Sequence, residues 1–176
     1  MKIAVNEIFY TIQSEGMFTG KPALFIRTQG CPVQCKWCDT KHTWAILPSQ
    51  QVTLEEILEK NITSINKKYC YIEPNDILTQ CIKNNAKLVV ITGGEPCVYD
   101  LNEITKLLID NGINVQIETS GTQPISCDNR TYICVSPKIG ICRKNITMNL
   151  EACKRADYIK MVITNIIFFV SMVFFV

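Results

Sequence analysis

The sequence has little charge, a single histidine and no apolar leader. Charged residues make up 19% of the chain and its net charge is +2. Proteins that bind nucleic acid carry strongly basic stripes or domains, so we expect no nucleic-acid partner. The first seven residues include no apolar stretch of the kind that opens a secretory signal peptide. The ten cysteines are therefore expected to be reduced thiols of a cytoplasmic protein rather than a disulfide framework.

Three cysteines lie within eight residues, at Cys31, Cys35 and Cys38. Three thiolates cannot complete the four-cysteine shell of an ordinary cubane iron–sulfur cluster. Such a site either takes a fourth ligand from elsewhere or leaves one metal position open, and open positions are typical of catalytic sites. A zinc site that uses His42 or another cysteine is the alternative. The other cysteines are interpreted as small buried hydrophobes or surface thiols, and they are Cys70, Cys81, Cys97, Cys127, Cys134, Cys142 and Cys153.

Segments of strand character alternate with segments of helix character along the chain. Strands are expected at 23–28, 87–92, 114–119 and 131–136, and helices at 53–65, 74–85, 100–111 and 146–155. With 176 residues and 47% hydrophobic content, the chain is long enough for one domain with its own core. This alternation predicts an α/β fold with a parallel sheet. Ligands of such sheets bind beyond the carboxyl ends of the strands, where the cysteine loop, Gly93 and Gly94, 118–120 and 136–138 all fall.

Two motifs together resemble the radical S-adenosylmethionine (SAM) superfamily. The cysteine spacing CxxxCxxC carries an aromatic residue, Trp37, directly before the last cysteine. The segment 92–96 reads Thr-Gly-Gly-Glu-Pro, and its glycines allow the backbone to approach a ligand closely. In that superfamily the corresponding segment meets the methionine end of SAM. Either motif alone would be weaker than the pair.

Six segments are similar to one family within that superfamily, the 7-carboxy-7-deazaguanine synthases. They are 7–16, 20–27, 37–44, 90–96, 116–122 and 135–138, and the resemblance extends from about residue 3 to residue 160. It implies an abbreviated, partial (β/α) barrel with the site at the C-terminal ends of its parallel strands. It also implies a lyase that contracts the ring of 6-carboxy-5,6,7,8-tetrahydropterin to 7-carboxy-7-deazaguanine with loss of ammonia, in queuosine biosynthesis. The implied cofactors are a [4Fe–4S] cluster, SAM and Mg²⁺, and the implied partners are a reducing electron donor of the flavodoxin or ferredoxin type and a second copy of the chain in a homodimer.

The resemblance also assigns roles to individual residues. Cys31, Cys35 and Cys38 match the cluster ligands, and Thr40 matches the Mg²⁺ position, where an oxygen ligand is chemically apt. The positions that match SAM contacts are Trp37, Cys38, Asp39, Gly94, Ser136, Pro137 and Lys138, with Glu118 and Ser120 as further candidates. The positions that match the pterin site are Ile12, Gln13, Ser14, Arg27 and Thr92. Arg27 suits a carboxylate because its guanidinium can bond both oxygens at once. No general acid or base is assigned, and His42 is interpreted as structural.

The sequence departs from the family at two places. Ser14 stands where the family usually has glycine, so it would be strained if the backbone there needs a positive φ. After Lys160 the resemblance stops, and 161–176 is a run of sixteen uncharged residues, shorter than the roughly 20 that a transmembrane helix needs. We interpret 1–160 as the radical SAM domain and 161–176 as a frameshifted or truncated end, with a tail anchor or a final strand as alternatives. An inactive remnant or a metal-binding structural module is the alternative function.

Overall fold

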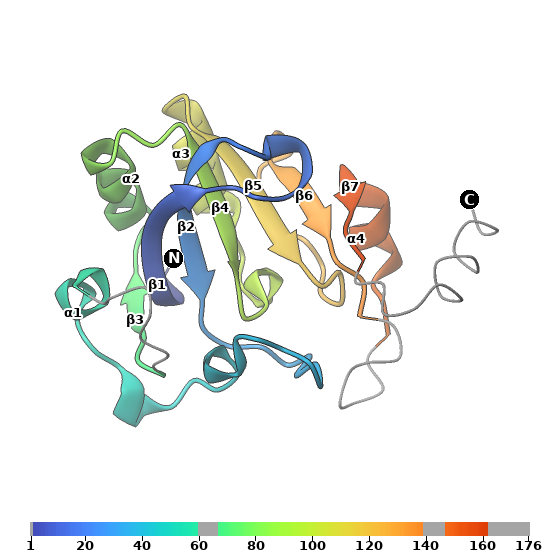
Figure 1. Cartoon of the computed structure of the whole chain (residues 1–176), viewed down its shortest axis with the longest axis horizontal. Helices are drawn as coiled ribbons and strands as arrows, with labels where there is room; N and C mark the ends of the chain where they lie inside the picture. The colour runs from blue at the N-terminus through green and yellow to red at the C-terminus, as the bar shows by residue number, and fades with distance from the viewer. Residues whose placement is uncertain (1, 60–66, 139–146, 162–176) are drawn as a thin grey trace.

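The protein is built around one mixed β-sheet. The computed structural model describes residues 2–59, 67–138 and 147–161. Within these ranges seven strands form a sheet of order β3-β1-β2-β4-β5-β6-β7 (Figure 1). Their bounds are β1 Ile3–Ile12, β2 Pro22–Thr28, β3 Cys70–Ile72, β4 Leu88–Gly93, β5 Asn114–Thr119, β6 Tyr132–Val135 and β7 Tyr158–Ile159. The order leaves β3 and β7 at the two edges, so the barrel is partial rather than closed.

The strand directions divide the sheet into two parts. β2, β4, β5, β6 and β7 are parallel to one another, as the alternation of strands and helices predicted. β1 is antiparallel to both β2 and β3, so the expectation of a purely parallel sheet was incomplete. The connection 13–21 between β1 and β2 allows this pairing, because antiparallel neighbours need no crossover helix.

The helices follow local sequence signals. Their bounds are α1 Leu54–Leu58, α2 Pro74–Lys83, α3 Asn102–Asp110 and α4 Leu150–Arg155. Thr53 and Glu56 form the predicted capping box at the start of α1, and Pro74 occupies the first turn of α2, where its missing N–H costs nothing. The expected extension of the first helix to Ile65 and the expected start of the last helix at Ile146 lie outside the described residues; 147–149 are not helical, and α4 begins at Leu150.

The two faces of the sheet are covered differently, because successive side chains of a strand point to opposite faces. Ile26, Ile91 and Ile117 belong to the main core together with Ile104 and Leu108 of α3, and all five are at most 1% exposed. On the other face a smaller cluster gathers Phe18 of the turn Gly16–Phe18 with residues of β2, β4 and β6. In the described part of the chain, no helix has the length and apolar character needed to cross a membrane.

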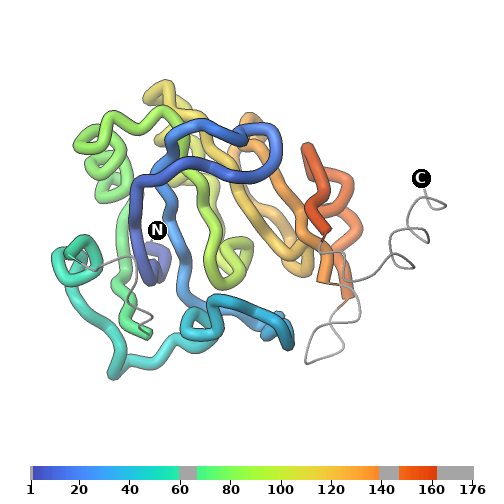
Figure 2. Tube along the Cα trace, viewed as in Figure 1, coloured from blue at the N-terminus to red at the C-terminus, as the bar shows by residue number. Residues whose placement is uncertain are grey.

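The carboxyl ends of the parallel strands meet the long loop that follows β2. In Figure 1 the arrowheads of β2, β4, β5 and β6 point toward the same edge, and the loop after β2 runs along it. Figure 2 shows the same loop as a continuous tube below these strand ends. The loop begins with Gln29 and contains the three clustered cysteines. The topology therefore brings the cysteines to the edge where the sequence placed the ligand site.

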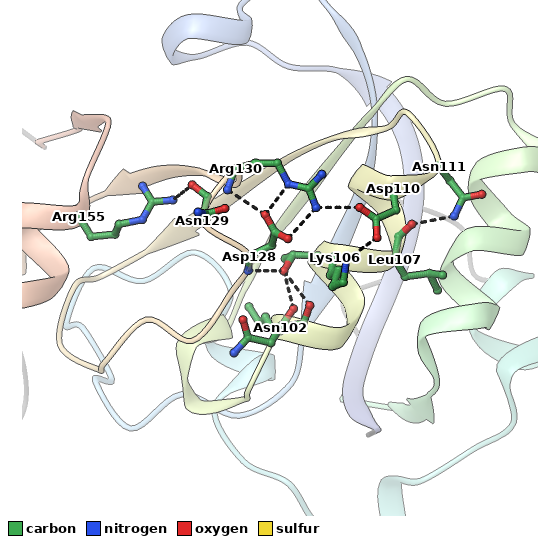
Figure 3. A network of polar contacts seen from close by, with 11 residues as sticks. Asn102, Lys106, Leu107, Asp110, Asn111, Asp128, Asn129, Arg130 and Arg155 are labelled. Atoms are coloured by element: carbon green, nitrogen blue, oxygen red, sulfur yellow. Dashed lines mark hydrogen bonds and ion pairs between the residues drawn. The ribbon is translucent and has the colours of Figure 1, made fainter.

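A polar network stabilises the opposite end of the strands, where β5 and β6 begin (Figure 3). Arg130, just before β6, pairs with Asp128 and with Asp110 at the end of α3, both at 2.8 Å. Lys106 pairs with the other oxygen of Asp110 at 2.6 Å. Arg155 reaches the backbone carbonyl of Asn129 at 2.8 Å. These contacts join the connections at the amino ends of β5 and β6, which in α/β folds generally serve stability rather than chemistry.

Candidate functional site

A cavity of about 430 Å³ lies at the carboxyl ends of the parallel strands. This volume is within the range of small-molecule sites, roughly 300–1,000 Å³. The parallel strands β2, β4, β5, β6 and β7 contribute to the cavity directly or through the segment that follows each of them. The lining residues are Glu15, Arg27, Cys31, Val33, Cys35, Trp37, Cys38, Asp39, Thr40, Thr92, Gly93, Gly94, Glu95, Glu118, Thr119, Ser120, Ser136, Lys138, Lys160 and Met161.

The cysteine loop is folded by its own backbone hydrogen bonds. The Gly30 and Cys31 N–H groups donate to the carbonyls of Thr43 and Trp44, at 2.7 and 3.1 Å. The Cys38 N–H donates to the Cys35 carbonyl at 3.2 Å, which turns the chain so that both side chains and that of Cys31 line the cavity. Burial raises the pKa of the Cys31 thiol above its ordinary value. A metal would reverse this, because a coordinating thiol is deprotonated.

The donor set fits an iron–sulfur cluster better than a zinc ion. Three thiols share one cavity, yet the described residues contain no group of three or more His, Cys, Asp or Glu side chains arranged to hold one metal ion. A cubane cluster has no such requirement, because each thiolate binds a different iron. His42, the proposed fourth ligand of the zinc alternative, is half-buried in the turn Lys41–Thr43 and does not line the cavity.

Gly94 allows the loop after β4 to touch the cysteine loop. Its N–H donates to the Thr28 carbonyl at 3.0 Å, and the next N–H, of Glu95, donates to the Gly30 carbonyl at 2.9 Å. A Cβ atom at Gly94 would collide with the Gly30 carbonyl oxygen. Gly93 has a φ of 119°, a conformation that L side chains rarely adopt. The sequence motif thus allows the two loops to pack closely.

The buried carboxylate of Glu95 joins β4 to the end of β5. Glu95 is 1% exposed and accepts hydrogen bonds from the Thr119 hydroxyl and from both the hydroxyl and the N–H of Ser120. A fourth bond comes from the Cys97 N–H at 3.1 Å. A buried carboxylate is tolerated when it is fully hydrogen-bonded in this way. Glu95 therefore fixes the positions of Thr119 and Ser120 beside the cavity.

Glu118 is held by side chains from four segments. Its Oε1 accepts from Gln13 Nε2 at 2.9 Å and from Gln116 Nε2 at 3.0 Å. Its Oε2 lies 3.4 Å from the Thr92 hydroxyl, which donates to it, and 3.5 Å from Lys160 Nζ. The carboxylate is thus anchored on one oxygen and more loosely contacted on the other, which is the arrangement expected of an acceptor that serves a ligand.

Arg27 is oriented from the neighbouring strand. Arg27 and Glu7 are register partners on β2 and β1, and Arg27 Nε forms an ion pair with Glu7 Oε1. The guanidinium lies 5.6 Å from the ring centre of Phe9, a cation–π distance. The two terminal nitrogens of Arg27 take no part in this ion pair, and the side chain lines the cavity. Both features suit the binding of a carboxylate.

Lys138 and Trp37 form another wall of the cavity. Lys138 Nζ donates to the Ser136 hydroxyl at 2.6 Å and lies 5.1 Å from the ring centre of Trp37. Burial lowers the pKa of Lys138, and the nearby charge of Lys160 acts in the same direction. The indole of Trp37 is 41% exposed, so its ring presents open apolar surface beside the last cysteine of the triplet.

Comparisons with known proteins give the family. The sequence model of the radical SAM superfamily matches residues 25–164. The chain is 47% identical to the 7-carboxy-7-deazaguanine synthase of Escherichia coli (strain K12) over 162 residues, which cover 91% of this chain and 71% of that protein. The chain belongs to the radical SAM superfamily. Within it, the identity to the E. coli protein places the chain in the 7-carboxy-7-deazaguanine synthase family.

Two further relatives agree with this assignment. The 7-carboxy-7-deazaguanine synthase of Buchnera aphidicola subsp. Schizaphis graminum is 50% identical over 141 residues, which cover 79% of this chain and 64% of that protein. The crystal structure of QueE from Escherichia coli superimposes with a TM-score of 0.92 at 43% identity and covers 99% of this chain and 76% of that chain. The radical SAM fold expected from the sequence is therefore confirmed.

Most positions that the resemblance to this family singled out meet in the cavity. They are Arg27, Cys31, Cys35, Trp37, Cys38, Asp39, Thr40, Thr92, Gly94, Glu118, Ser120, Ser136 and Lys138. Four others do not line it. Ile12 is 60% exposed, Ser14 is exposed, Pro137 is half-buried, and Gln13 is 3% exposed behind Glu118. Among the described non-glycine residues, positive φ occurs at Gln34 and Asn85 but not at Ser14, so serine fits there without strain.

Sequence reasoning assigned no role to four polar residues of the cavity, Glu15, Glu95, Thr119 and Lys160. Glu15 and Glu95 lie inside segments that resemble those of the deazaguanine synthases. The resemblance could therefore have marked both residues, but it gave neither of them a role. Thr119 follows Glu118 at the end of a predicted strand. Lys160 had no local signal, because its place in the cavity depends on β7 pairing with β6.

Proposed function

We propose that this chain catalyses the reaction of the 7-carboxy-7-deazaguanine synthases. In this carbon–nitrogen lyase reaction, 6-carboxy-5,6,7,8-tetrahydropterin contracts by a radical route to 7-carboxy-7-deazaguanine and ammonia is lost, as a step of queuosine biosynthesis. The observation that carries the proposal is the convergence of the cysteine triplet, Gly94 and Arg27 on one cavity. Membership of the synthase family supports the choice of substrate.

Two sets of residues would hold the cofactors. Cys31, Cys35 and Cys38 would bind a [4Fe–4S] cluster through their thiolates. SAM would lie along the residues between the cysteine loop and the other strand ends, which are Trp37, Asp39, Gly94, Ser120, Ser136 and Lys138. Once bound, the reduced cluster and SAM together supply the carbon-centred radical that removes a hydrogen atom from the substrate. The protein contributes orientation, exclusion of water and electrostatics.

The substrate would lie on the side of the cavity formed by β2, β4 and β5. Arg27 would bind the carboxylate of the pterin, because Glu7 and Phe9 already fix the direction of its guanidinium. The hydroxyl of Thr92 and the carboxylate of Glu118 line the same side, 3.4 Å apart, and offer polar partners to the heterocycle. Val33 is 1% exposed and keeps part of the wall apolar.

The remaining parts of the proposal concern Mg²⁺, partners and location. Thr40, whose hydroxyl oxygen is 3.5 Å from Cys38 Sγ, would supply an oxygen ligand to Mg²⁺ beside the cluster. Formation of the radical consumes one electron, which a flavodoxin or ferredoxin would deliver. The proposal includes a homodimer, as the resemblance to the family implies. It also includes a cytoplasmic location, since free thiols persist in reducing compartments.

Anaerobic reconstitution tests the proposal. The protein is loaded with iron and sulfide, reduced with dithionite, and incubated with SAM and the carboxylated pterin, and the products are measured by mass spectrometry. We expect a broad visible absorption that dithionite bleaches, and formation of 7-carboxy-7-deazaguanine. A colourless protein that binds zinc would contradict the cluster. A protein with the cluster but without product would instead be the inactive remnant or structural module that the sequence left open.

A further inference from the structure

Lys160 connects the end of the sheet to the cavity. It directly follows β7, and its N–H donates to the Val135 carbonyl at 2.8 Å, which fixes its backbone against β6. Its side chain is 32% exposed and lines the cavity. Lys160 Nζ lies 2.5 Å from Glu15 Oε2 and 3.5 Å from Glu118 Oε2. One ammonium group thus contacts two carboxylates of the cavity wall.

The two carboxylates come from segments far from β7 in sequence, and Tyr158 of β7 also packs against Gly16, the residue after Glu15. Glu15 belongs to the turn after β1, 145 residues before Lys160 in sequence. Glu118 is the penultimate residue of β5. Burial by itself would lower the pKa of Lys160, but the hydrogen bond to Glu15 and the charge of Glu118 outweigh it and raise the pKa above its ordinary value. Lys160 is therefore a cation throughout the neutral pH range.

The contacts of Glu118 show what this cation can do. Two amide groups, from Gln13 and Gln116, hold Oε1 at 2.9 and 3.0 Å. The contacts of Oε2 with the residues that the structure describes are longer, 3.4 Å to Thr92 and 3.5 Å to Lys160. Oε2 is thus placed by charge attraction more than by short hydrogen bonds, and it can still accept a bond from a ligand. Thr92 and Arg27, which contribute to the same wall, mark this as the side that the proposed function gives to the pterin.

We propose that Lys160 is a positioning residue for the pterin. It holds Glu118 Oε2 toward the cavity, and it binds Glu15 and so fixes the turn after β1 to the end of β7. The inference rests on the proposed function, and it deepens that function by adding a residue with which the substrate side of the site is pre-organised. Lys160 acts through Glu118 and Glu15 rather than on the reacting atoms. Its loss should therefore affect pterin binding more than SAM binding.

Three variants and one control test the inference in the reconstituted full chain. Lys160→Met removes the cation, Lys160→Arg keeps it, and Glu15→Gln weakens its short contact. Lys154→Met is the matched control, since Lys154 pairs with Glu151 on the exposed surface of α4, where the two side chains are 73% and 80% exposed. Dissociation constants for 6-carboxy-5,6,7,8-tetrahydropterin and for SAM are measured anaerobically, together with the melting temperature and the iron content.

We expect Lys160→Met to weaken pterin binding about tenfold, the lower end for a charge-assisted bond because the lysine is partly exposed, and SAM binding less than about twofold. Lys160→Arg should recover most of the loss, and Lys154→Met should match the unchanged chain. Equal weakening of both ligands by Lys160→Met in a folded protein, or unchanged pterin binding, would overturn the inference.

The outcomes separate this inference from the proposed function. If the unchanged chain fails to bind the pterin, the proposed function itself is wrong. If the unchanged chain binds it and Lys160→Met binds it equally well, only the role of Lys160 is wrong. If Lys160→Met melts early or loses iron, Glu15→Gln decides, because its side chain is 52% exposed and its loss leaves the core intact. Pterin affinity unchanged in Glu15→Gln would then overturn the inference.

Discussion

Gln13 Nε2 donates a hydrogen bond to Glu118 Oε1 at 2.9 Å, and 105 residues separate the two in sequence. Gln13 is 3% exposed and does not line the cavity, whereas Glu118 does. The backbone of Gln13 is fixed as well, since its N–H donates to the Lys21 carbonyl and its carbonyl accepts from the Gly20 N–H. The side chain that resembles a substrate contact in sequence is thus placed to act through the carboxylate in front of it.

Gln13→Leu should therefore weaken pterin binding without removing a direct contact. The change keeps the volume but deletes one of the two short donors to Glu118 Oε1, and a buried hydrogen bond to a charged group is worth roughly 1.5–3 kcal/mol. We expect a loss of about tenfold in pterin affinity at the low end of that range. Equilibrium binding measures it, and Ile82→Ala, at a 72% exposed position of α2 outside the cavity, is the control expected to have no effect.

Iron binding should depend on the cavity cysteines alone. Cys31→Ala, Cys35→Ala and Cys38→Ala should each abolish the cluster. A cluster with one open iron has only three protein ligands, so each of the three thiolates is needed to hold it. Cys127→Ala and Cys153→Ala should retain it, since neither thiol lines the cavity. Iron and sulfide per chain give the answer after anaerobic reconstitution. A cluster retained in Cys35→Ala, or lost in Cys127→Ala, would contradict the assignment of the ligands.

Arg27→Lys should weaken pterin binding more than SAM binding. Lysine keeps the charge but loses the planar fork and the Nε that pairs with Glu7. The loss of one charge-assisted bond, roughly 1.5–3 kcal/mol, corresponds to about a ten- to a hundredfold weaker affinity. Titration of each ligand separately measures the difference. Equal effects on both ligands, or no effect on either, would argue against Arg27 as the carboxylate-binding residue.

The ion pairs of Arg130 with Asp128 and Asp110, at the amino ends of β5 and β6, should make the stability of the protein depend on pH without affecting the cavity. The Arg130 guanidinium holds the pKa of the Asp128 carboxyl well below its usual range. Asp128 therefore contributes stability that is present above its unfolded pKa of about 4 and is lost as the pH falls through its lower folded pKa. Asp128→Asn should be less stable than the unchanged chain near neutral pH, and the difference should shrink in acid.

Denaturant unfolding near pH 7 and near pH 3 tests this expectation. Substitution at Asp128 should leave pterin and SAM binding unchanged near neutral pH, because the residue lies at the amino end of β6, away from the cavity. A stability difference that grew in acid would mean that another group dominates.

The sequence also makes a prediction for 161–176. The proposed function expects coupled turnover by the chain as it stands. If this uncharged run were instead a frameshift product, the chain would bind the cluster but release 5′-deoxyadenosine with little deazaguanine product, since a poorly enclosed site favours side reactions. In that case a chain that ends at Lys160 should be more soluble and no more active, and a family-like segment after Lys160 should restore activity. The ratio of product to 5′-deoxyadenosine compares the three proteins. Coupled turnover by the chain as it stands would show that the frameshift interpretation is wrong.

Local chemistry was sufficient for several elements of the fold. The β-branched run before Gly93 was predicted as a buried strand and is β4, and 114–119 was predicted with the bounds that β5 has. Thr53 and Pro74 marked the starts of α1 and α2 because capping and first-turn preferences involve only neighbouring residues. The cysteine spacing likewise predicted that Cys31, Cys35 and Cys38 lie around a common centre, and all three line the cavity.

Contacts between distant segments were decided by the tertiary structure. β1 pairs antiparallel with β2, and this register sets Glu7 beside Arg27. The parallel addition of β7 to β6 brings Lys160 to the cavity, within reach of Glu15 and Glu118. The sequence by itself predicted most of the residues proposed to carry the chemistry, because such a prediction depends on side-chain type and local spacing. Which of them face the cavity and which stand behind it, as Gln13 does, depends on sheet register and packing, which local sequence does not encode.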